Sequence, residues 1–188
     1  MKYEVEQKFP VAEMAALAAR LAALGGTVSQ PQSEIDHYYA HPARDFAASD
    51  EALRVRRTDQ GNYVTYKGPK VDTTTKTRRE IELPLWSQED KVAALERLLE
   101  ALGFAPVAEV CKYRRKAIIP WQGHQIEAAL DDVAEVGTYV ELELLAEDDE
   151  VDSARACIGS LARHLGLSGS ERRSYLELLL ERRGDQQP

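Results

Sequence analysis

Hydrophobic and polar residues alternate with a period of two along much of this chain, and the stretches between show a helical period. The alternating segments predict eight strands, at residues 3–9, 28–39, 52–58, 62–68, 76–83, 105–119, 125–133 and 138–145. Short turn sequences such as Asp59-Gln60-Gly61-Asn62 and Trp121-Gln122-Gly123-His124 join neighbouring strands. Strands joined by such short turns run antiparallel, so the pattern predicts an antiparallel sheet or barrel.

Four segments carry helical periodicity. Residues 11–24, 87–102 and 151–165 each run into a glycine, which is a typical helix end, and a shorter helix is expected at 174–183. Together with the strands, they predict an α+β fold in which helices pack outside an eight-stranded antiparallel β-barrel or tunnel. No composition break divides the chain, so we expect a single domain at 1–183 followed by a polar tail at 184–188.

The composition narrows the possible partners. The 188 residues include 24 Lys plus Arg and 32 Asp plus Glu, which gives a formal net charge of -8. Duplex nucleic acid and acidic membrane surfaces both favour a basic protein face, so we expect neither as a partner. Glu4 and Glu6 occupy the place where a signal peptide would be apolar, and no segment is long and apolar enough to span a membrane. We therefore expect a cytoplasmic protein.

The charged residues of the predicted strands fall on single faces, because residues two apart in a strand point the same way. Strand by strand, a solvated outer face is the default interpretation. The strands taken together do not fit this default, because their polar faces are almost purely ionic. Their opposite faces supply the apolar surface that the helices need to cover. A closed sheet would therefore turn the ionic faces inward. The sets are Glu4, Glu6 and Lys8; Arg54 and Arg56; Lys67; Arg78, Glu80 and Glu82; Lys112, Arg114 and Lys116; Glu127 and Asp131; Glu141 and Glu143.

An interior of this kind suits a highly charged ligand. Buried charges cost several kcal/mol each unless they are paired, hydrated or bound. Carboxylates two apart suit hard divalent cations such as Mg²⁺ or Mn²⁺, and Arg and Lys suit phosphate oxygens. Acid and base on one lining therefore indicate a complex of a divalent metal with a polyphosphate.

Short charged motifs follow one another along the chain in a fixed order. They are Glu4-Val5-Glu6-Gln7-Lys8, Asp36-His37-Tyr38-Tyr39, Leu53-Arg54-Val55-Arg56, Thr65-Tyr66-Lys67-Gly68-Pro69-Lys70, Arg78-Arg79-Glu80-Ile81-Glu82, Lys112-Tyr113-Arg114, Leu130-Asp131-Asp132-Val133 and Val140-Glu141-Leu142-Glu143. In this order they resemble the CYTH superfamily of triphosphate tunnel metalloenzymes, which contains class IV adenylate cyclases and thiamine triphosphatases. The end of the chain resembles the cyclase branch in particular, in the sequence Arg173-Ser174-Tyr175-Leu176-Glu177-Leu178-Leu179.

The resemblance implies a role for each member of the ionic set. It implies Mg²⁺ or Mn²⁺ held by Glu4, Glu6 and Glu141, with Glu143 close behind. It implies a phosphate grip made by Lys8, Arg54, Arg56, Lys67, Arg78, Lys112 and Arg114. It leaves the roles of four further lining residues open, namely Glu80, Glu82, Glu127 and Asp131. The residues expected to matter most for catalysis are Glu4, Glu6, Lys8, Arg56 and Glu141.

Three functions are compatible with this set. The first is metal-dependent cyclisation of ATP to cyclic AMP and pyrophosphate. The second is hydrolysis of inorganic tripolyphosphate or of an organic triphosphate such as thiamine triphosphate. The third, ranked last because every Glu of the motifs is present, is a non-catalytic polyphosphate- or nucleotide-binding module. A monomer and a homodimer are both compatible with the sequence.

Overall fold

Eight antiparallel strands form one sheet in the computed structural model, which describes residues 2–69, 78–85 and 88–185. The order across the sheet is β1-β8-β7-β6-β2-β3-β4-β5. The strands are β1 (Lys2–Pro10), β2 (Gln32–Ala40), β3 (Ala52–Thr58), β4 (Gly61–Lys67), β5 (Glu80–Pro84), β6 (Ala105–Trp121), β7 (His124–Val133) and β8 (Gly137–Glu147).

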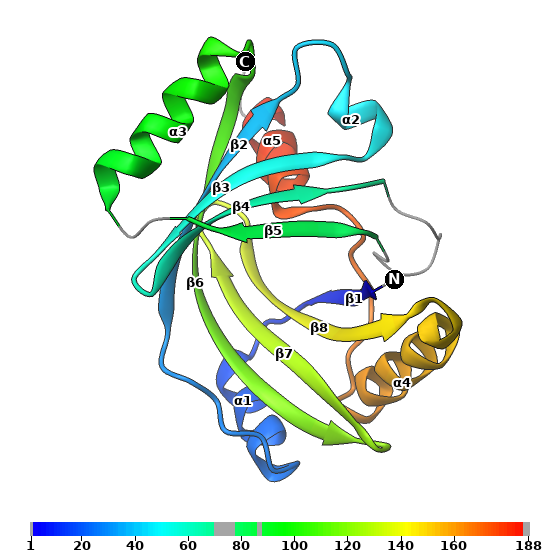
Figure 1. Ribbon diagram of the computed structural model, residues 1–188. Coiled ribbons are helices and arrows are strands. Elements are labelled where there is room, and N and C mark those ends of the chain that lie inside the picture. The colour runs from blue at the N-terminus through cyan, green and yellow to red at the C-terminus, as the bar shows by residue number, and fades with distance from the viewer. Residues whose placement is uncertain (1, 70–77, 86–87, 186–188) are drawn as a thin grey trace.

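The sheet curls strongly, so that it encloses a space on its concave side (Figure 1). Its edge strands are β1 and β5, and an isolated antiparallel bridge joins Glu4 of β1 to Arg78, just before β5. The predicted eight-stranded antiparallel sheet is confirmed, in the form of a curled half-barrel whose two edges approach each other.

Most of the helices pack on the outside of this sheet, as predicted, whereas the C-terminal helix packs against Tyr38, Val110 and Tyr139, whose side chains share strand faces with the ionic residues (Figure 1). The helices are α1 (Met14–Ala23), α2 (Phe46–Ser49), α3 (Glu89–Ala101), α4 (Val151–His164) and α5 (Tyr175–Asp185), with a 3₁₀ turn at Asp148–Glu150. Leu17 of α1 and Ile158 of α4 are fully buried in one cluster with Val5, Val140 and Leu142 from β1 and β8. Burial of the apolar strand faces against the helices leaves the ionic faces for the concave side.

Several elements differ from the sequence-based prediction in their bounds, and one was not predicted. β2 begins at Gln32 rather than at residue 28, and Pro31 directly before it has no N–H to donate to a sheet. The helix α2 was not predicted, because its four residues are too few to show a period. The Asp45 side chain accepts a hydrogen bond from the Ala48 N–H and so caps this short helix. Residues 76 and 77 of the predicted fifth strand lie outside the described residues.

The last helix was expected to end at Arg183 and continues to Asp185. Among the described residues, no helix has both the length and the apolar character that a membrane span requires.

Candidate functional site

The concave side of the sheet holds a cavity of about 1230 Å³. Thirteen of the fifteen predicted site residues line it. The lining members of the predicted set are Glu4, Glu6, Arg54, Arg56, Lys67, Arg78, Glu80, Glu82, Lys112, Arg114, Glu127, Glu141 and Glu143. Lys8 and Asp131 lie just behind this lining, almost fully buried, and reach it through contacts with Glu141 and Arg114. The structure therefore brings the whole predicted set to one place.

Asp36 of β2 stands at the centre of the first basic group in the cavity wall. Its Oδ1 accepts a hydrogen bond of 2.6 Å from Arg56 Nε, and its Oδ2 accepts bonds of 2.8 Å from Arg56 Nη2 and 2.9 Å from Lys112 Nζ. Arg54 Nη1 lies 3.3 Å from the same Oδ2. Although burial raises the pKa of Asp36, the three cations outweigh this effect and hold the pKa well below its usual range.

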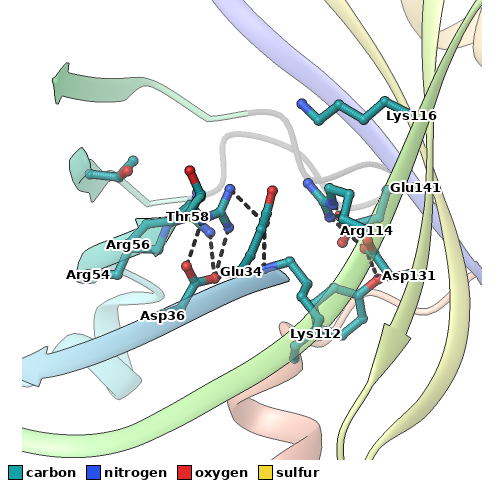
Figure 2. Close-up of polar contacts among 12 residues, drawn as sticks. Glu34, Asp36, Arg54, Arg56, Thr58, Lys112, Arg114, Lys116, Asp131 and Glu141 are labelled. Atoms are coloured by element: carbon teal, nitrogen blue, oxygen red, sulfur yellow. Dashed lines mark hydrogen bonds and ion pairs between the residues drawn. The ribbon is translucent and has the colours of Figure 1, made fainter. Parts of the chain in front are cut away.

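Glu34, two residues before Asp36 on the same strand face, extends this group. Its Oε2 lies 3.0 Å from Lys112 Nζ and 3.1 Å from Arg56 Nη1. Burial alone would raise the pKa of Glu34, but Arg114, Lys112 and Arg56 together lower it to about 2. Two anions from β2 thus hold cations from β3 and β6 in fixed positions (Figure 2).

Arg114 of β6 belongs to a second group. Asp131 of β7 binds it in the bidentate manner, with Nε–Oδ1 at 2.6 Å and Nη2–Oδ2 at 2.5 Å, and Glu141 Oε2 also lies 2.5 Å from Nη2. The Tyr175 hydroxyl donates a hydrogen bond of 2.7 Å to Asp131 Oδ2. Lys8 Nζ lies 3.8 Å from Glu141 Oε1. Figure 2 shows Arg114 between Asp131 and Glu141, beside the Asp36 group.

Three carboxylates form a separate acidic cluster. Glu4 and Glu6 of β1 and Glu143 of β8 each offer an oxygen, and these atoms all lie within 4.8 Å of one another. The register pairs Glu6 directly with Glu143, so both side chains point into the cavity. Burial and the charge of Glu4 raise the pKa of Glu143 well above its ordinary value, and burial raises that of Glu4. A divalent cation would offset this repulsion, and three carboxylates at this spacing fit Mg²⁺ or Mn²⁺.

The remaining predicted residues surround these three groups. Glu141 contacts Arg114 and Lys8, whereas Glu143 is the member of this β8 pair that lies in the acidic cluster. Four further contacts of the lining join Lys67 to Glu80, Thr65 to Glu82, Arg78 to Asp50 and Lys116 to Glu127. The last pair is half-exposed, with 47% of the Lys116 side chain accessible, and so belongs to the rim.

Sequence reasoning missed three residues that the structure adds to the site. Glu34 and Asp36 bind the cations of the first group, and Tyr175 contacts the second. The sequence of β2 could have indicated the two acids, because Glu34 and Asp36 are two residues apart and so lie on one strand face, like the charged residues of the other strands. Tyr175 had no such signal, since its hydroxyl reaches Asp131 across 44 positions of the sequence.

Comparison with known proteins agrees with this geometry. "Putative adenylate cyclase MJ0240" of Methanocaldococcus jannaschii is 35% identical over 178 residues, which cover 93% of this chain and 97% of that protein. The PH1819 protein of Pyrococcus horikoshii has a solved structure that matches with a TM-score of 0.81 at 38% identity, over 95% of this chain and 98% of that one.

A third structure is more distant. The structure of the "Putative adenylyl cyclase HpAC1" of Hippeastrum, described as having a dominant triphosphatase activity, matches with a TM-score of 0.64 at 16% identity, over 96% of each chain. This match supports the fold alone. The CYTH domain itself matches residues 2–175, nearly the whole chain. The curled sheet, its ionic lining and this match together show that the chain belongs to the CYTH family.

Proposed function

We propose that this protein is a divalent-metal-dependent adenylate cyclase, which converts ATP to cyclic AMP and pyrophosphate. Membership of the CYTH family supports an enzyme that acts on a triphosphate. The relative MJ0240, which carries an adenylate cyclase name, supports the cyclase activity in particular, because it matches over almost the full length of both chains.

One observation carries the proposal. A cluster of three carboxylates and two groups of oriented cations line the same cavity. The cations suit the non-bridging oxygens of a polyphosphate, and the carboxylates suit the metal that accompanies it. Arg54 Nε adds to this fit, because it is buried and has no hydrogen-bond partner among the described residues.

Glu4, Glu6 and Glu143 would hold the metal, and Glu141 lies close enough in sequence and in the sheet to belong to the same wall. A divalent ion bound there would lower the pKa of a substrate hydroxyl and offset negative charge at phosphorus. The carboxylates themselves contribute position, since they come from two adjacent paired strands of the sheet and not from loops.

The basic residues bind and orient the substrate. In the proposed reaction, the ribose 3′ hydroxyl loses its proton to water and its oxygen forms a bond to the α-phosphorus. The bond from that phosphorus to the oxygen that bridges it to the β-phosphate breaks, and pyrophosphate leaves. Arg56, Lys112 and Arg114 would hold the β- and γ-phosphates and stabilise the charge that develops on the leaving group. Because Glu34, Asp36 and Asp131 already fix these cations, little reorganisation is needed during the reaction.

A product assay tests the proposal. Purified protein is incubated with ATP, and separately with inorganic tripolyphosphate, in Mg²⁺ or Mn²⁺, and the products are separated by chromatography. We expect cyclic AMP and pyrophosphate in equal amounts from ATP. Orthophosphate from tripolyphosphate without cyclic AMP would instead identify a hydrolase, and tight binding without turnover would identify a binding module.

The variant Glu4→Gln tests the assignment of the acidic cluster. Mutation of a residue that hydrogen-bonds to a metal ligand typically lowers metal affinity or activity about 10–100-fold. Loss of a ligand itself is therefore expected to lower turnover by roughly a hundredfold or more. The matched control is Glu13→Gln, which changes an exposed glutamate before α1 and is expected to keep full activity. Full activity in Glu4→Gln would show that the metal assignment is wrong.

A further inference from the structure

We propose that Tyr175 is a positioning residue that holds two buried cations, Arg114 in the cavity wall and Lys8 just behind it, in the positions in which they act on bound phosphate. The inference rests on the proposal that the cavity binds a triphosphate. It concerns a residue of the C-terminal helix α5 that is 7% exposed and lies at the first position of that helix.

The hydroxyl of Tyr175 acts on Arg114 through Asp131. It donates a 2.7 Å hydrogen bond to Asp131 Oδ2, the same oxygen that accepts the 2.5 Å bond from Arg114 Nη2. Asp131 is fully buried, so its two oxygens have protein partners in place of water. With both oxygens held, the plane of the guanidinium is fixed, and so is the direction in which its other nitrogen points.

The ring of Tyr175 acts on Lys8. Lys8 Nζ lies 4.0 Å from the centre of this ring and 5.8 Å from that of Tyr139, and the two rings meet edge to face at 5.5 Å. The negative face of an aromatic ring attracts an ammonium group, most strongly where water is excluded. Lys8 is 1% exposed, so the ring contributes to keeping a charged group at this buried position.

The backbone before α5 fixes Tyr175 relative to β1. The Glu171 N–H donates a 2.8 Å hydrogen bond to the Lys8 carbonyl, and Lys8 Nζ donates a 2.5 Å bond to the carbonyl of Arg173. Ser174 then caps the helix, since its Oγ accepts a bond from the Glu177 N–H while the Glu177 carboxylate accepts one from the Ser174 N–H. The C-terminal segment is thus tied to the strand that carries Lys8, and Tyr175 connects it to β7 and β6.

Two substitutions of Tyr175 distinguish the effect of its hydroxyl on phosphate binding from the effect of its ring. Tyr175→Phe removes only the bond to Asp131, and Tyr175→Leu removes the ring as well. Binding of inorganic tripolyphosphate is measured by calorimetry with EDTA present, so that neither cyclisation nor hydrolysis takes place. We expect the Kd to rise about tenfold in Tyr175→Phe, as for loss of a hydrogen bond to a charged group. A further rise of about threefold to tenfold is expected in Tyr175→Leu from loss of the ring contact.

The control distinguishes positioning from helix packing. Leu179 is 1% exposed in the same apolar cluster as Tyr175 and does not line the cavity. Leu179→Ala is expected to lower the melting temperature more than Tyr175→Phe does, while leaving the Kd for tripolyphosphate unchanged. If Leu179→Ala weakens binding as much as Tyr175→Phe, the effect is one of packing and the inference is wrong.

A double-mutant cycle tests the route through Asp131. If Tyr175 acts through this carboxylate, the effect of Tyr175→Phe on the Kd largely disappears in an Asp131→Asn background, whereas independent effects would multiply. An unchanged Kd in Tyr175→Phe would overturn the inference, even if the wild type forms cyclic AMP. Conversely, a wild type that makes no cyclic AMP, with binding weakened in Tyr175→Phe, would reject the cyclase proposal and support the inference.

Discussion

Individual acidic residues of this site serve two different purposes. Glu34, Asp36 and Asp131 contact cations, which lowers the pKa of Glu34 and of Asp36. Glu143 lies among other carboxylates and has a raised pKa. Residues of the first kind hold the phosphate-binding cations close together at a tolerable electrostatic cost, and residues of the second kind form a site for a cation.

Glu34 is expected to contribute to stability at neutral pH and to lose this contribution in acid. Its folded-state pKa of about 2 lies below the ordinary value of 4.5, so ionisation favours the folded state above about pH 4.5, and the gain disappears as the pH falls toward 2. Glu34→Gln should therefore lower the free energy of unfolding at pH 7 by roughly 2–3 kcal/mol, with a smaller difference at pH 3.5. Urea unfolding at both pH values measures this, and an equal loss at both would contradict it.

In the metal-free protein, ionised Glu143 is expected to lower the stability at neutral pH, whereas ionised Glu34 raises it. Because its folded-state pKa is raised, its ionised form destabilises the fold, and stability is lost as the pH rises above the ordinary value of 4.5. Glu143→Gln should raise the melting temperature at pH 7 in EDTA, and should reduce the further rise that Mn²⁺ produces in the wild type.

The matched variant Glu141→Gln compares the two glutamates of β8 directly. Glu141 contacts Arg114 and Lys8, so its substitution should destabilise the metal-free protein, unlike Glu143→Gln. If Glu141→Gln abolishes the Mn²⁺ effect and Glu143→Gln preserves it, the acidic cluster of Glu4, Glu6 and Glu143 is not the metal site.

At the scale of elements, alternation predicted the strands well because each strand has one ionic and one apolar face. β3 matches its predicted bounds, whereas β2 starts later than predicted, because Pro31 has a pyrrolidine ring and no N–H to donate to the sheet. The helix α2 left no periodic signal in four residues.

The partners of each charge could not be predicted from the sequence. Asp36 lies between Arg54, Arg56 and Lys112 only because β2 pairs with β3 on one side and with β6 on the other. Strand order and register decide such contacts, and the alternation pattern carries neither. The resemblance implied both Glu141 and Glu143 as metal ligands, and of these two the geometry places Glu143 in the cluster with Glu4 and Glu6.

At the scale of the whole molecule, the net charge of -8 and a phosphate-binding interior are compatible. The cations that matter most are hidden from the outer surface, since Lys8, Lys112 and Arg114 are 1%, 4% and 7% exposed. A ligand small enough to enter the cavity meets a basic wall, whereas a duplex meets an acidic exterior.

Because the cations are buried and the exterior is acidic, we expect the protein to select phosphate ligands by their size and shape. Tripolyphosphate at a hundred times its Kd should stabilise the folded state by about 2.7 kcal/mol, which raises the melting temperature by roughly 5–10 °C for a chain of this length. Duplex DNA at the same phosphate concentration and physiological salt should produce no measurable shift, because it cannot reach the buried cations. Arg114→Met should lose most of the tripolyphosphate shift, and thermal unfolding of both proteins with each ligand measures all of these effects. A DNA-induced shift similar to that of tripolyphosphate would mean that the basic groups are accessible from outside, and the enclosed phosphate site would have to be abandoned.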